Sequence, residues 1–437
     1  MHKPANALGA IALIAASFFA ASAGAANTAN TASTASTADT NDQIVILVGI
    51  DGLRADAIDR ATAPNMRALA ARGVRAEGMT PAMPSKTFVN LYSIATGLHP
   101  KNHGIVSNYF YDRKFGREMD RSRDIQDARW WGGEPIWVTA EKQGVKTGTN
   151  TWLGAEAPVG GVQPTYWNPY SKSHESDVYA ARVDQVLEWL DLPDGKNIRL
   201  GTLYFSAVDD AAHQNHLNST QELQAIEMLD EQMGRLVEGL KDRGLYKRSN
   251  IIIVSDHGMI DLSPDRIINL DPIMDVSPFI TPDWNRSRGP AYLAFMNLYG
   301  NEDAIEEAFQ KLNGAHPHLR VLRRGAFPEN YHFDHPDRAP DLMLLADPGW
   351  VVYATEDQTP LPSMLPYLKA THGFHNLHPD MRATFIAAGP SFAEGVVTKP
   401  FDNIEVYGII ACALGINPAK TDGNIKNVTH FMTRECD

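Results

Sequence analysis

Short apolar runs alternate with amphipathic stretches along most of this chain, and this alternation limits the possible folds more than any other feature. Three short, almost wholly apolar runs, 43–50, 197–208 and 249–256, are typical of buried strands. Two stretches, 178–190 and 220–244, carry apolar residues at helical spacing. Strands that alternate with helices usually form a mostly parallel sheet. We therefore predict an α/β fold in which helices cover both faces of a mostly parallel central sheet.

Two segments interrupt this alternation. Residues 108–170 are rich in aromatic residues, glycine and proline, which predicts loops around a pocket. Residues 278–347 contain strand-like AYLAFMNL, the helical pattern DAIEEAFQKL and strand-like DLMLLA. This second segment predicts a small inserted α+β subdomain at about 278–347.

The N-terminus has the pattern of a secretory signal. A start containing Lys3 precedes the apolar run 7–23 and the small residues Ala23-Gly24-Ala25. We expect a signal peptide over 1–25, cleaved near Ala25/Ala26, although an uncleaved membrane anchor is the alternative. Residues 26–42 are small and polar and predict a flexible leader. Because no later stretch approaches about 20 apolar residues, we expect an exported body, periplasmic or secreted, without a stable membrane span.

The overall charge disfavours one class of partner. The chain has 39 Lys and Arg against 52 Asp and Glu, a formal net charge of −13. Polynucleotide affinity comes mainly from basic side chains, so a coat of nucleic acid is not expected. An anionic substrate would therefore need local positive charge, and bound metal ions are one source of it.

The cysteines leave two alternatives open. Cys412 and Cys436 are the only two in the sequence, and an exported compartment permits a disulfide between them. A buried thiol and a separate thiol near the C-terminus explain the sequence equally well. Neither alternative makes these residues catalytic.

Carboxylates and imidazoles follow the predicted strands. The three apolar runs lead into Asp51, Asp209 and the pair Asp256-His257, and the carboxyl ends of parallel strands meet at one edge of a sheet. A helix that begins near Asp209 would place it and the residue four positions later on the same face. Mixed carboxylate and imidazole ligands suit zinc. The predicted metal ligands are Asp51, Asp209, His213, Asp256, His257 and His372.

Thr87 is the candidate nucleophile. Pro81 and Pro84 disfavour helix before it, while TFVNLYSIATG can begin one, which places Thr87 near a helix N-terminus. Free backbone N–H groups at such a position stabilise an alkoxide or a phosphate. A threonine there can also be an ordinary N-cap.

With these residues in place, the sequence resembles the nucleotide pyrophosphatase/phosphodiesterase family of the alkaline phosphatase superfamily. The resemblance extends from about Ile44 to Asn427. Its most specific segments are VGIDGLRAD (48–56), PSKTFVNLYSIATGLHPKNHGIVSN (84–108), SDHGM (255–259), THGFHN (371–376), MRATFIAAGPSF (381–392) and NIEVYGIIACALGINPAKTDGN (403–424).

The resemblance implies two Zn²⁺ ions. Asp51, Asp256 and His257 match the ligands of one zinc, and Thr87 matches both a further ligand and the nucleophile. Three further residues match the ligands of the second zinc, namely Asp209, His213 and His372. His372 takes the histidine position of the family's HG[FY] element, with His375 as the alternative if the loop is shifted.

The resemblance also implies a substrate site. Asn108 matches the residue that hydrogen-bonds a phosphate oxygen, and Phe88 and Tyr170 resemble the aromatic residues that stack on a nucleobase. The implied function of residues 43–437 is an exported, zinc-dependent hydrolase. It would cleave phosphodiester or pyrophosphate bonds of small nucleotides through a phospho-threonine intermediate and release nucleoside 5′-monophosphates.

Other members of the superfamily provide alternatives. The chain has TFVNLY where the family often has TFPNHY, so Val89 and Leu91 leave open a phospholipase C-like activity on choline lipids. A phosphate monoesterase would need an additional cationic group, and Lys86 and Arg54 lie near the motifs. A sulfatase would need Cys or Ser at position 87. A protein that only binds its ligand would not need Thr87 together with all six predicted metal ligands. The sequence makes no prediction of the oligomeric state.

Overall fold

An eight-stranded sheet forms the centre of the protein in the computed structural model, which describes residues 42–282, 291–355 and 368–436. The strand order is β19-β2-β18-β9-β1-β8-β6-β7. The strands are β1 Ile44–Ile50, β2 Val74–Ala76, β6 Thr147–Asn150, β7 Tyr166–Asn168, β8 Leu200–Phe205, β9 Ser249–Val254, β18 Phe385–Ala388 and β19 Val396–Thr398. β18 is antiparallel to both of its neighbours, and the other pairings are parallel.

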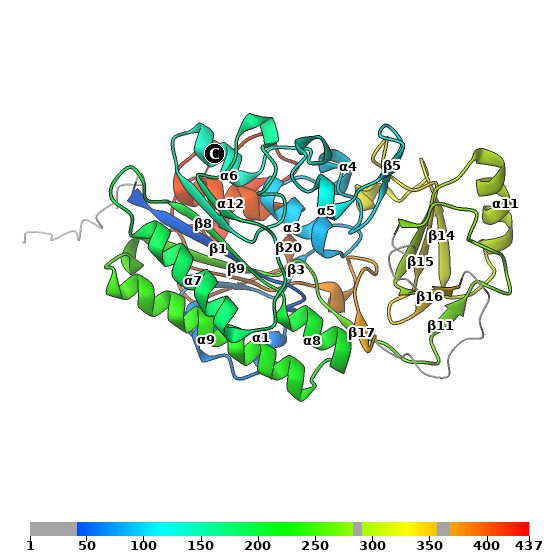
Figure 1. The fold of residues 1–437 in the computed structure, drawn as a ribbon. Helices are drawn as coiled ribbons and strands as arrows, with labels where there is room; N and C mark the ends of the chain where they lie inside the picture. Colours follow the sequence, from blue (N-terminus) through cyan, green and yellow to red (C-terminus); the bar gives the residue numbers. More distant parts are fainter. Residues whose placement is uncertain (1–41, 283–290, 356–367, 437) are drawn as a thin grey trace, which may run out of the picture. The chain divides into compact units, whose positions relative to one another are not determined.

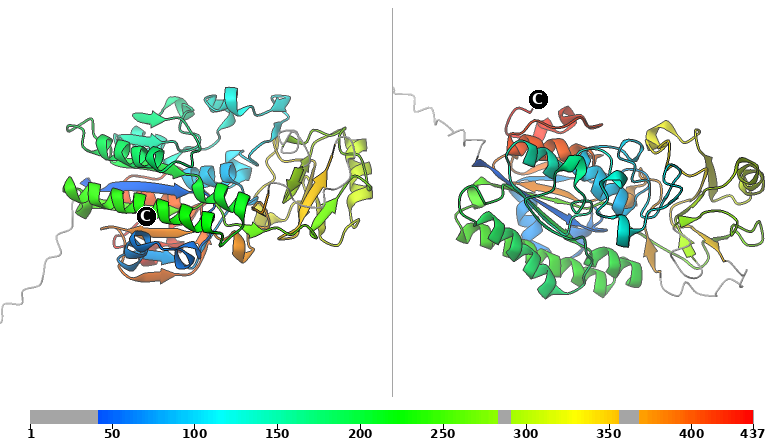
Figure 2. Two further views of the ribbon diagram at one scale, coloured as in Figure 1. Left: turned by 60° about the horizontal axis from the view of Figure 1, so that its bottom comes forward. Right: turned by 45° about the horizontal axis from the view of Figure 1, so that its top comes forward.

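Helices cover both faces of this sheet, as Figure 1 shows. α2, α7 and α9 pack on one face, and α3, α6 and α12 on the other. The long helix α9, in green, runs along the strands in both views of Figure 2. The helices of the two layers, together with α8, are α2 Pro64–Ala71, α3 Thr87–Thr96, α6 Ile136–Lys142, α7 Ser176–Leu190, α8 Ala207–Asn215, α9 Thr220–Asp242 and α12 Glu405–Leu414.

The central strand β1 is apolar throughout because both of its faces are buried. Val45 and Leu47 belong to the core on the α3 and α12 side, whereas Ile46 and Val48 pack with α7 and α9. A strand that is buried on both faces has no polar alternation, which is why the sequence shows a continuous apolar run there. The described residues all fall within one compact unit.

Two three-stranded sheets follow β9 in sequence, with orders β11-β16-β12 and β13-β15-β14. Their elements are β11 Ile267–Asn269, β12 Ala291–Leu293, β13 Phe295–Leu298, α11 Glu302–Leu312, β14 Leu319–Arg323, β15 Leu342–Ala346 and β16 Val351–Ala354. The run AYLAFMNL is thus divided between β12 and β13, which belong to different sheets. The first sheet includes strands outside 278–347, and a subdomain of those bounds stays a prediction.

Shorter elements complete the described fold. They are α1 Ala57–Arg60, β3 Met79–Thr80, α4 Pro100–His103, β4 Tyr111–Asp112, β5 Arg117–Glu118, α5 Arg121–Asp124, β10 Ile260–Asp261, β17 Ala370–Thr371 and β20 Phe401–Asp402. The prediction that 108–170 consists of loops was wrong in part, because α6, β6 and β7 lie within it and the two strands join the central sheet. β6 reads Thr-Gly-Thr-Asn and is wholly buried, so no apolar run marks it in the sequence.

The structure describes the C-terminal end of the chain as far as residue 436 and begins at residue 42. The predicted signal peptide, and the leader as far as residue 41, lie outside the described residues. Cys412 on α12 and Cys436 form a disulfide, which decides between the two alternatives for the cysteines. No helix in the described part of the chain has both the length and the apolar character needed to span a membrane.

Candidate active site

Three neighbouring strands bring three carboxylates to one edge of the central sheet. Asp51 follows β1 directly, and Asp256 lies two residues beyond the end of β9. Asp209 lies in the first turn of α8, because β8 ends at Phe205 and the helix begins at Ala207. β1 lies between β9 and β8, with Ile50 opposite Phe205 and Gly49 opposite Val254. The parallel pairing therefore makes the three side chains neighbours.

The first group of potential ligands consists of Asp51, Asp256 and His257, all fully buried. One ligand atom from each lies within 4.8 Å of the others. His257 Nε2 is 3.4 Å from Asp51 Oδ1 and 3.0 Å from Asp256 Oδ2. The other oxygen of Asp256 accepts hydrogen bonds from the backbone N–H groups of Gly52 and His257, which fixes the carboxylate.

The second group consists of Asp209, His257 and His372, also with ligand atoms within 4.8 Å of one another. Asp209 Oδ1 is 3.6 Å from His372 Nε2 and 3.2 Å from Nε2 of His213, one helical turn further along α8. The rings of His257 and His372 stack with centroids 3.5 Å apart. The structure thus brings all six predicted ligands together, and His257 contributes to both groups. His375 instead packs edge-on against Tyr331.

Backbone carbonyls fix the orientation of the three histidines. The Nδ1 atoms of His213, His257 and His372 lie 2.7, 3.0 and 2.7 Å from the carbonyl oxygens of Ala370, Gly258 and Ser85. A carbonyl oxygen can only accept a hydrogen bond, so each Nδ1 carries the proton. Each Nε2 then directs a lone pair towards the carboxylates. Metal-binding histidines usually have this outer partner, which holds the ring in place.

The residues present fit a bound cation. Three buried carboxylate oxygens, Asp51 Oδ1, Asp209 Oδ1 and Asp256 Oδ2, have no hydrogen-bond partner in the described structure. Each of them faces a histidine Nε2 lone pair, and lone pairs that converge in a buried site require positive charge between them. Burial, with help from the Asp209 and Asp256 carboxylates, raises the pKa of Asp51. Carboxylate oxygen and imidazole nitrogen are ligands of zinc and related divalent ions.

Thr87 lies beside the ligand groups as the first residue of α3. Lys86 precedes the helix in extended conformation, and Gly97 ends it in the left-handed region with φ of 64°. The Thr87 hydroxyl oxygen is 3.3 Å from His257 Nε2, and the side chain is 4% exposed. The hydroxyl lies at the positive end of the helix dipole, so negative charge on it or next to it would be stabilised.

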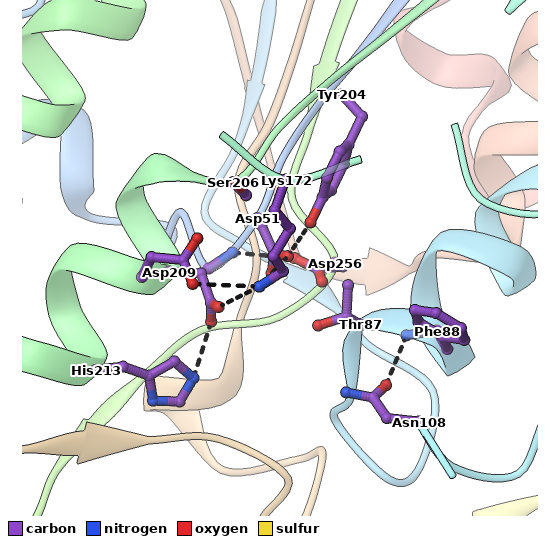
Figure 3. A network of polar contacts seen from close by, with 12 residues as sticks. Asp51, Thr87, Phe88, Asn108, Lys172, Tyr204, Ser206, Asp209, His213 and Asp256 are labelled. Carbon is purple, nitrogen blue, oxygen red and sulfur yellow. Dashed lines mark hydrogen bonds and ion pairs between the residues drawn. The ribbon is translucent and has the colours of Figure 1, made fainter. Parts of the chain in front are cut away.

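Asn108 is oriented by the neighbour of Thr87. The Phe88 backbone N–H donates to Asn108 Oδ1 over 2.9 Å. This bond identifies the oxygen end of the amide, so the NH₂ group is the end that remains for another acceptor. In Figure 3 that nitrogen and the Thr87 hydroxyl both point to the side on which Asp209 and His213 lie.

The two predicted nucleobase contacts lie close together. The rings of Phe88 and Tyr170 meet edge to face with centroids 5.6 Å apart. The Arg121 guanidinium lies 3.8 Å from the ring centres of both Phe88 and Tyr109, and it also donates to the Asn108 carbonyl. Arg121 therefore joins the aromatic residues to Asn108.

Tyr204 and Lys172 also contact the ligand groups, and neither residue was predicted from the sequence. The Tyr204 hydroxyl donates to Asp51 Oδ2, and Lys172 Nζ lies 3.3 Å from Asp209 Oδ2 and 3.9 Å from Asp51 Oδ2 (Figure 3). Burial acts to lower the pKa of the Lys172 ammonium, but the Asp209 and Asp51 carboxylates outweigh it and the pKa is raised. A tyrosine within an apolar strand is a weak signal in the sequence, and Lys172, in a polar loop, has none.

A buried set of carboxylates and imidazoles beside a threonine at a helix N-terminus, at one edge of a mostly parallel sheet, defines a hydrolase of the alkaline phosphatase-like class. Residues 45–375 match the family model described as type I phosphodiesterase / nucleotide pyrophosphatase. The chain belongs to this family of metal-dependent enzymes. Both the predicted family and the predicted fold class are thereby confirmed.

Related proteins agree with this assignment. The chain is 35% identical over 387 residues to an uncharacterized pyrophosphatase/phosphodiesterase of Schizosaccharomyces pombe, with 87% of this chain and 78% of that protein covered. It is 33% identical over 394 residues to a venom phosphodiesterase of Naja atra, covering 89% of this chain and 46% of that protein. It is 32% identical over 398 residues to ectonucleotide pyrophosphatase/phosphodiesterase family member 3 of Rattus norvegicus, with 89% and 44% covered. The chain thus spans a little under half the length of these last two relatives.

Solved structures are similar as well. Murine ectonucleotide pyrophosphatase/phosphodiesterase 5, an inactive threonine-to-alanine variant in complex with AMP, matches with a TM-score of 0.81 and 28% sequence identity. The match covers 90% of this chain and all of that one. The human counterpart gives the same TM-score, identity and coverage.

Proposed function

We propose that this protein is a zinc-dependent nucleotide pyrophosphatase/phosphodiesterase that acts through a covalent phospho-threonine. The observation that carries the proposal is the place of Thr87 Oγ1, 3.3 Å from His257 Nε2 at the start of α3. His257 belongs to both ligand groups, so the hydroxyl lies next to both. A serine or threonine hydroxyl is a weak nucleophile until a neighbouring base or metal activates it.

Two zinc ions would supply Lewis-acid charge here, one held by Asp51, Asp256, His257 and Thr87, the other by Asp209, His213 and His372. The residues of the chain supply the positioning. Thr87 Oγ1 forms a bond to phosphorus while the bond to the leaving oxygen breaks, and the leaving group takes the electron pair and the proton of the Thr87 hydroxyl. Water then adds to phosphorus as the P–Oγ1 bond breaks, which returns the proton to Thr87 and releases a nucleoside 5′-monophosphate.

Asn108 and the first turn of α3 are the proposed donors to the non-bridging oxygens. The amide of Asn108 is turned by its bond to the Phe88 N–H, so its NH₂ group is available for a phosphate oxygen. Donors that are fixed before the reaction stabilise charge as it develops and need no reorganisation. Helix N-termini bind phosphate groups in the same way.

The proposed substrates are small nucleotides. Phe88 directly follows Thr87 and packs edge to face with Tyr170, so a base held beside the nucleophile would meet this aromatic pair. The related murine protein is in complex with AMP, which supports a nucleotide as the class of ligand. Val89 and Leu91, the departures that left a lipid substrate open, are both fully buried in α3. They therefore change the packing of the helix and leave the nucleotide proposal as the better supported one.

The test compares variants of the nucleophile on a diester. We expect Thr87→Ala to lower kcat for the p-nitrophenyl ester of TMP by at least about a thousandfold, while its zinc content and circular dichroism stay those of the unmodified protein. Thr87→Ser keeps a hydroxyl and should retain measurable turnover. Rapid quenching of the unmodified enzyme should also yield a phosphorylated peptide containing Thr87. Undiminished hydrolysis by Thr87→Ala would refute the assignment.

A second comparison distinguishes the lipid alternative. The unmodified enzyme should prefer the TMP ester to p-nitrophenylphosphorylcholine. A preference for the choline ester would instead favour the phospholipase C-like activity.

We also propose that the protein is exported and that 43–437 is its catalytic domain. The disulfide between Cys412 and Cys436 supports an oxidising compartment. N-terminal sequencing of the protein recovered from its host should give a start near Ala26. A start at Met1 would contradict cleavage of the signal.

A further inference from the structure

Lys172 lies between the two ligand groups and contacts the outer oxygens of their carboxylates. Its ammonium nitrogen is 3.3 Å from Asp209 Oδ2, 3.4 Å from Asp210 Oδ1 and 3.9 Å from Asp51 Oδ2. The side chain extends from the loop after β7 and is 40% exposed. Among the described residues, no other Lys or Arg side chain forms an ion pair with Asp51 or Asp209.

The two oxygens of each carboxylate face different partners. Asp51 Oδ1 faces His257 Nε2, while Oδ2 accepts from Tyr204 and lies near Lys172. Asp209 Oδ1 likewise faces two histidines, while Oδ2 faces Lys172. The lysine and a metal ion therefore use opposite oxygens of the same carboxylates, so both can be present together. In each group the carboxylate lies between the ammonium and the histidine nitrogens.

The contacts of Lys172 are long for direct ion pairs. Charged N–H···O bonds usually measure about 2.7–2.9 Å, and all three distances here exceed that range. The ammonium is thus placed among several carboxylates without being bound tightly to one. It supplies a fixed unit of positive charge at the active site.

The other cations considered from the sequence are placed differently. Arg54 donates to both oxygens of Asp56, at 2.7 and 2.8 Å, and to Asp380. Lys86 lies over the Phe295 ring, with its Nζ 5.7 Å from the ring centre, and its charge acts on His213 and His372 of the second ligand group. Of these three cations, Lys172 is the one that forms ion pairs with both Asp51 and Asp209.

From this placement we infer a second activity, the hydrolysis of phosphate monoesters, in which Lys172 supplies the additional positive charge that a terminal phosphate requires. The inference rests on the proposed function, because it uses the same nucleophile. A phosphate monoester carries a charge between −1.5 and −2 near neutral pH, whereas a diester carries −1. A cation close to the reacting phosphate offsets part of that difference, and partial burial of the ammonium strengthens the effect relative to bulk water.

The reaction would follow the same two steps. Thr87 Oγ1 bonds to phosphorus as the P–OR bond breaks, and the departing oxygen keeps the electron pair and takes up the proton of the Thr87 hydroxyl. Water then adds to phosphorus as the P–Oγ1 bond breaks, and a proton returns to Thr87. The products are an alcohol and orthophosphate. A nucleoside 5′-monophosphate, the product of the proposed diester reaction, is itself such a substrate.

The experiment measures one ratio in several variants. The ratio is kcat/KM for p-nitrophenyl phosphate divided by kcat/KM for the p-nitrophenyl ester of TMP. We expect Lys172→Met to lower this ratio at least tenfold, equivalent to about 1.4 kcal/mol, and Lys172→Arg to keep it within about threefold. Lys311→Met removes an ion-paired lysine of similar exposure on α11 and should leave the ratio unchanged.

A binding measurement adds a second observable that loss of folded protein cannot imitate. The inhibition constant of orthophosphate against diester hydrolysis should rise about tenfold in Lys172→Met, with equal zinc content per chain in all variants.

The outcomes separate the two proposals. The inference is overturned if the unmodified enzyme cleaves the diester but not p-nitrophenyl phosphate above the Thr87→Ala background. It is also overturned if Lys172→Met lowers both activities equally or leaves the orthophosphate constant unchanged. Absence of diester hydrolysis in the unmodified enzyme would instead refute the proposed function, and the inference with it.

Discussion

Replacing Tyr204 by phenylalanine should weaken metal binding without touching a proposed ligand. The Tyr204 hydroxyl donates to Asp51 Oδ2, and both side chains are fully buried. A hydrogen bond to a charged group contributes about 1.5–3 kcal/mol. In Tyr204→Phe that oxygen keeps Lys172 at 3.9 Å as its polar side-chain neighbour within the described part of the chain, so Asp51 loses the contact that holds it in one orientation.

Two independent estimates give the expected change in zinc affinity. A loss of about 1.5–3 kcal/mol corresponds to a change of roughly 10- to 150-fold in an equilibrium constant. Removal of the outer partner of a metal ligand typically costs about 10- to 100-fold in metal affinity or activity. We therefore expect the zinc dissociation constant to rise by about 10- to 100-fold in this variant.

The assay is a zinc titration in competition with a chelator of known affinity, on protein whose thermal unfolding has been measured. Tyr166→Phe is the matched control, because its hydroxyl donates to the Lys196 carbonyl over 3.0 Å at the surface. That control should bind zinc like the unmodified protein. A zinc constant for Tyr204→Phe within threefold of the control would refute the argument that this hydroxyl positions Asp51.

Three further outcomes are expected. Asn108→Ala should lower kcat by about 10²- to 10³-fold with little change in zinc content, measured on the TMP ester, and a loss confined to KM would contradict its role in stabilising developing charge. Cys436→Ser opens a loop closed by residues 24 apart, so urea denaturation should show a loss of about 3.5 kcal/mol, and a loss below about 1 kcal/mol would contradict the loop-entropy estimate. Burial and the nearby His332 lower the pKa of His99 to about 4, so an unfolded chain takes up a proton below about pH 6.5 that the folded one does not. Stability should therefore fall between about pH 6.5 and 4, and His99→Gln should flatten the dependence of Tm on pH there, whereas an unchanged slope would exclude this residue as a cause.

The sequence predicted those features that depend on local pattern. Both faces of β1, β8 and β9 are buried, so their residues form continuous apolar runs that are easily recognised. The amphipathic patterns at 178–190 and 220–244 correspond to α7 and α9. Asp51, Asp209 and Asp256 could be placed at one sheet edge because the ends of parallel strands meet there. His372 was included as a further histidine in a Gly-containing loop, and the family resemblance then favoured it over His375.

What the sequence did not predict depends on contacts between distant segments. β6 is composed of Thr, Gly and Asn, and only its position between β7 and β8 makes it a buried strand. Lys172 and Tyr204 are 32 residues apart, and either could be an ordinary surface or core residue until the fold places both against Asp51. The pairing of Oδ1 with histidine and Oδ2 with lysine is likewise a property of the folded site alone.

The order of three adjacent parallel strands also sets the spacing of the segments that carry the three carboxylates. Asp51 directly follows β1, Asp256 lies two residues beyond β9 and Asp209 lies in the segment after β8, and these three strands are hydrogen-bonded neighbours. Parallel strands lie about 4.7–4.9 Å apart wherever they pair, so backbone hydrogen bonds set the spacing of the chain segments that carry the carboxylates. Loops around the edge can therefore exchange one substrate for another while the distance between the two ligand groups stays constant. A one-residue insertion in β1 would shift that register, and it should remove both groups together.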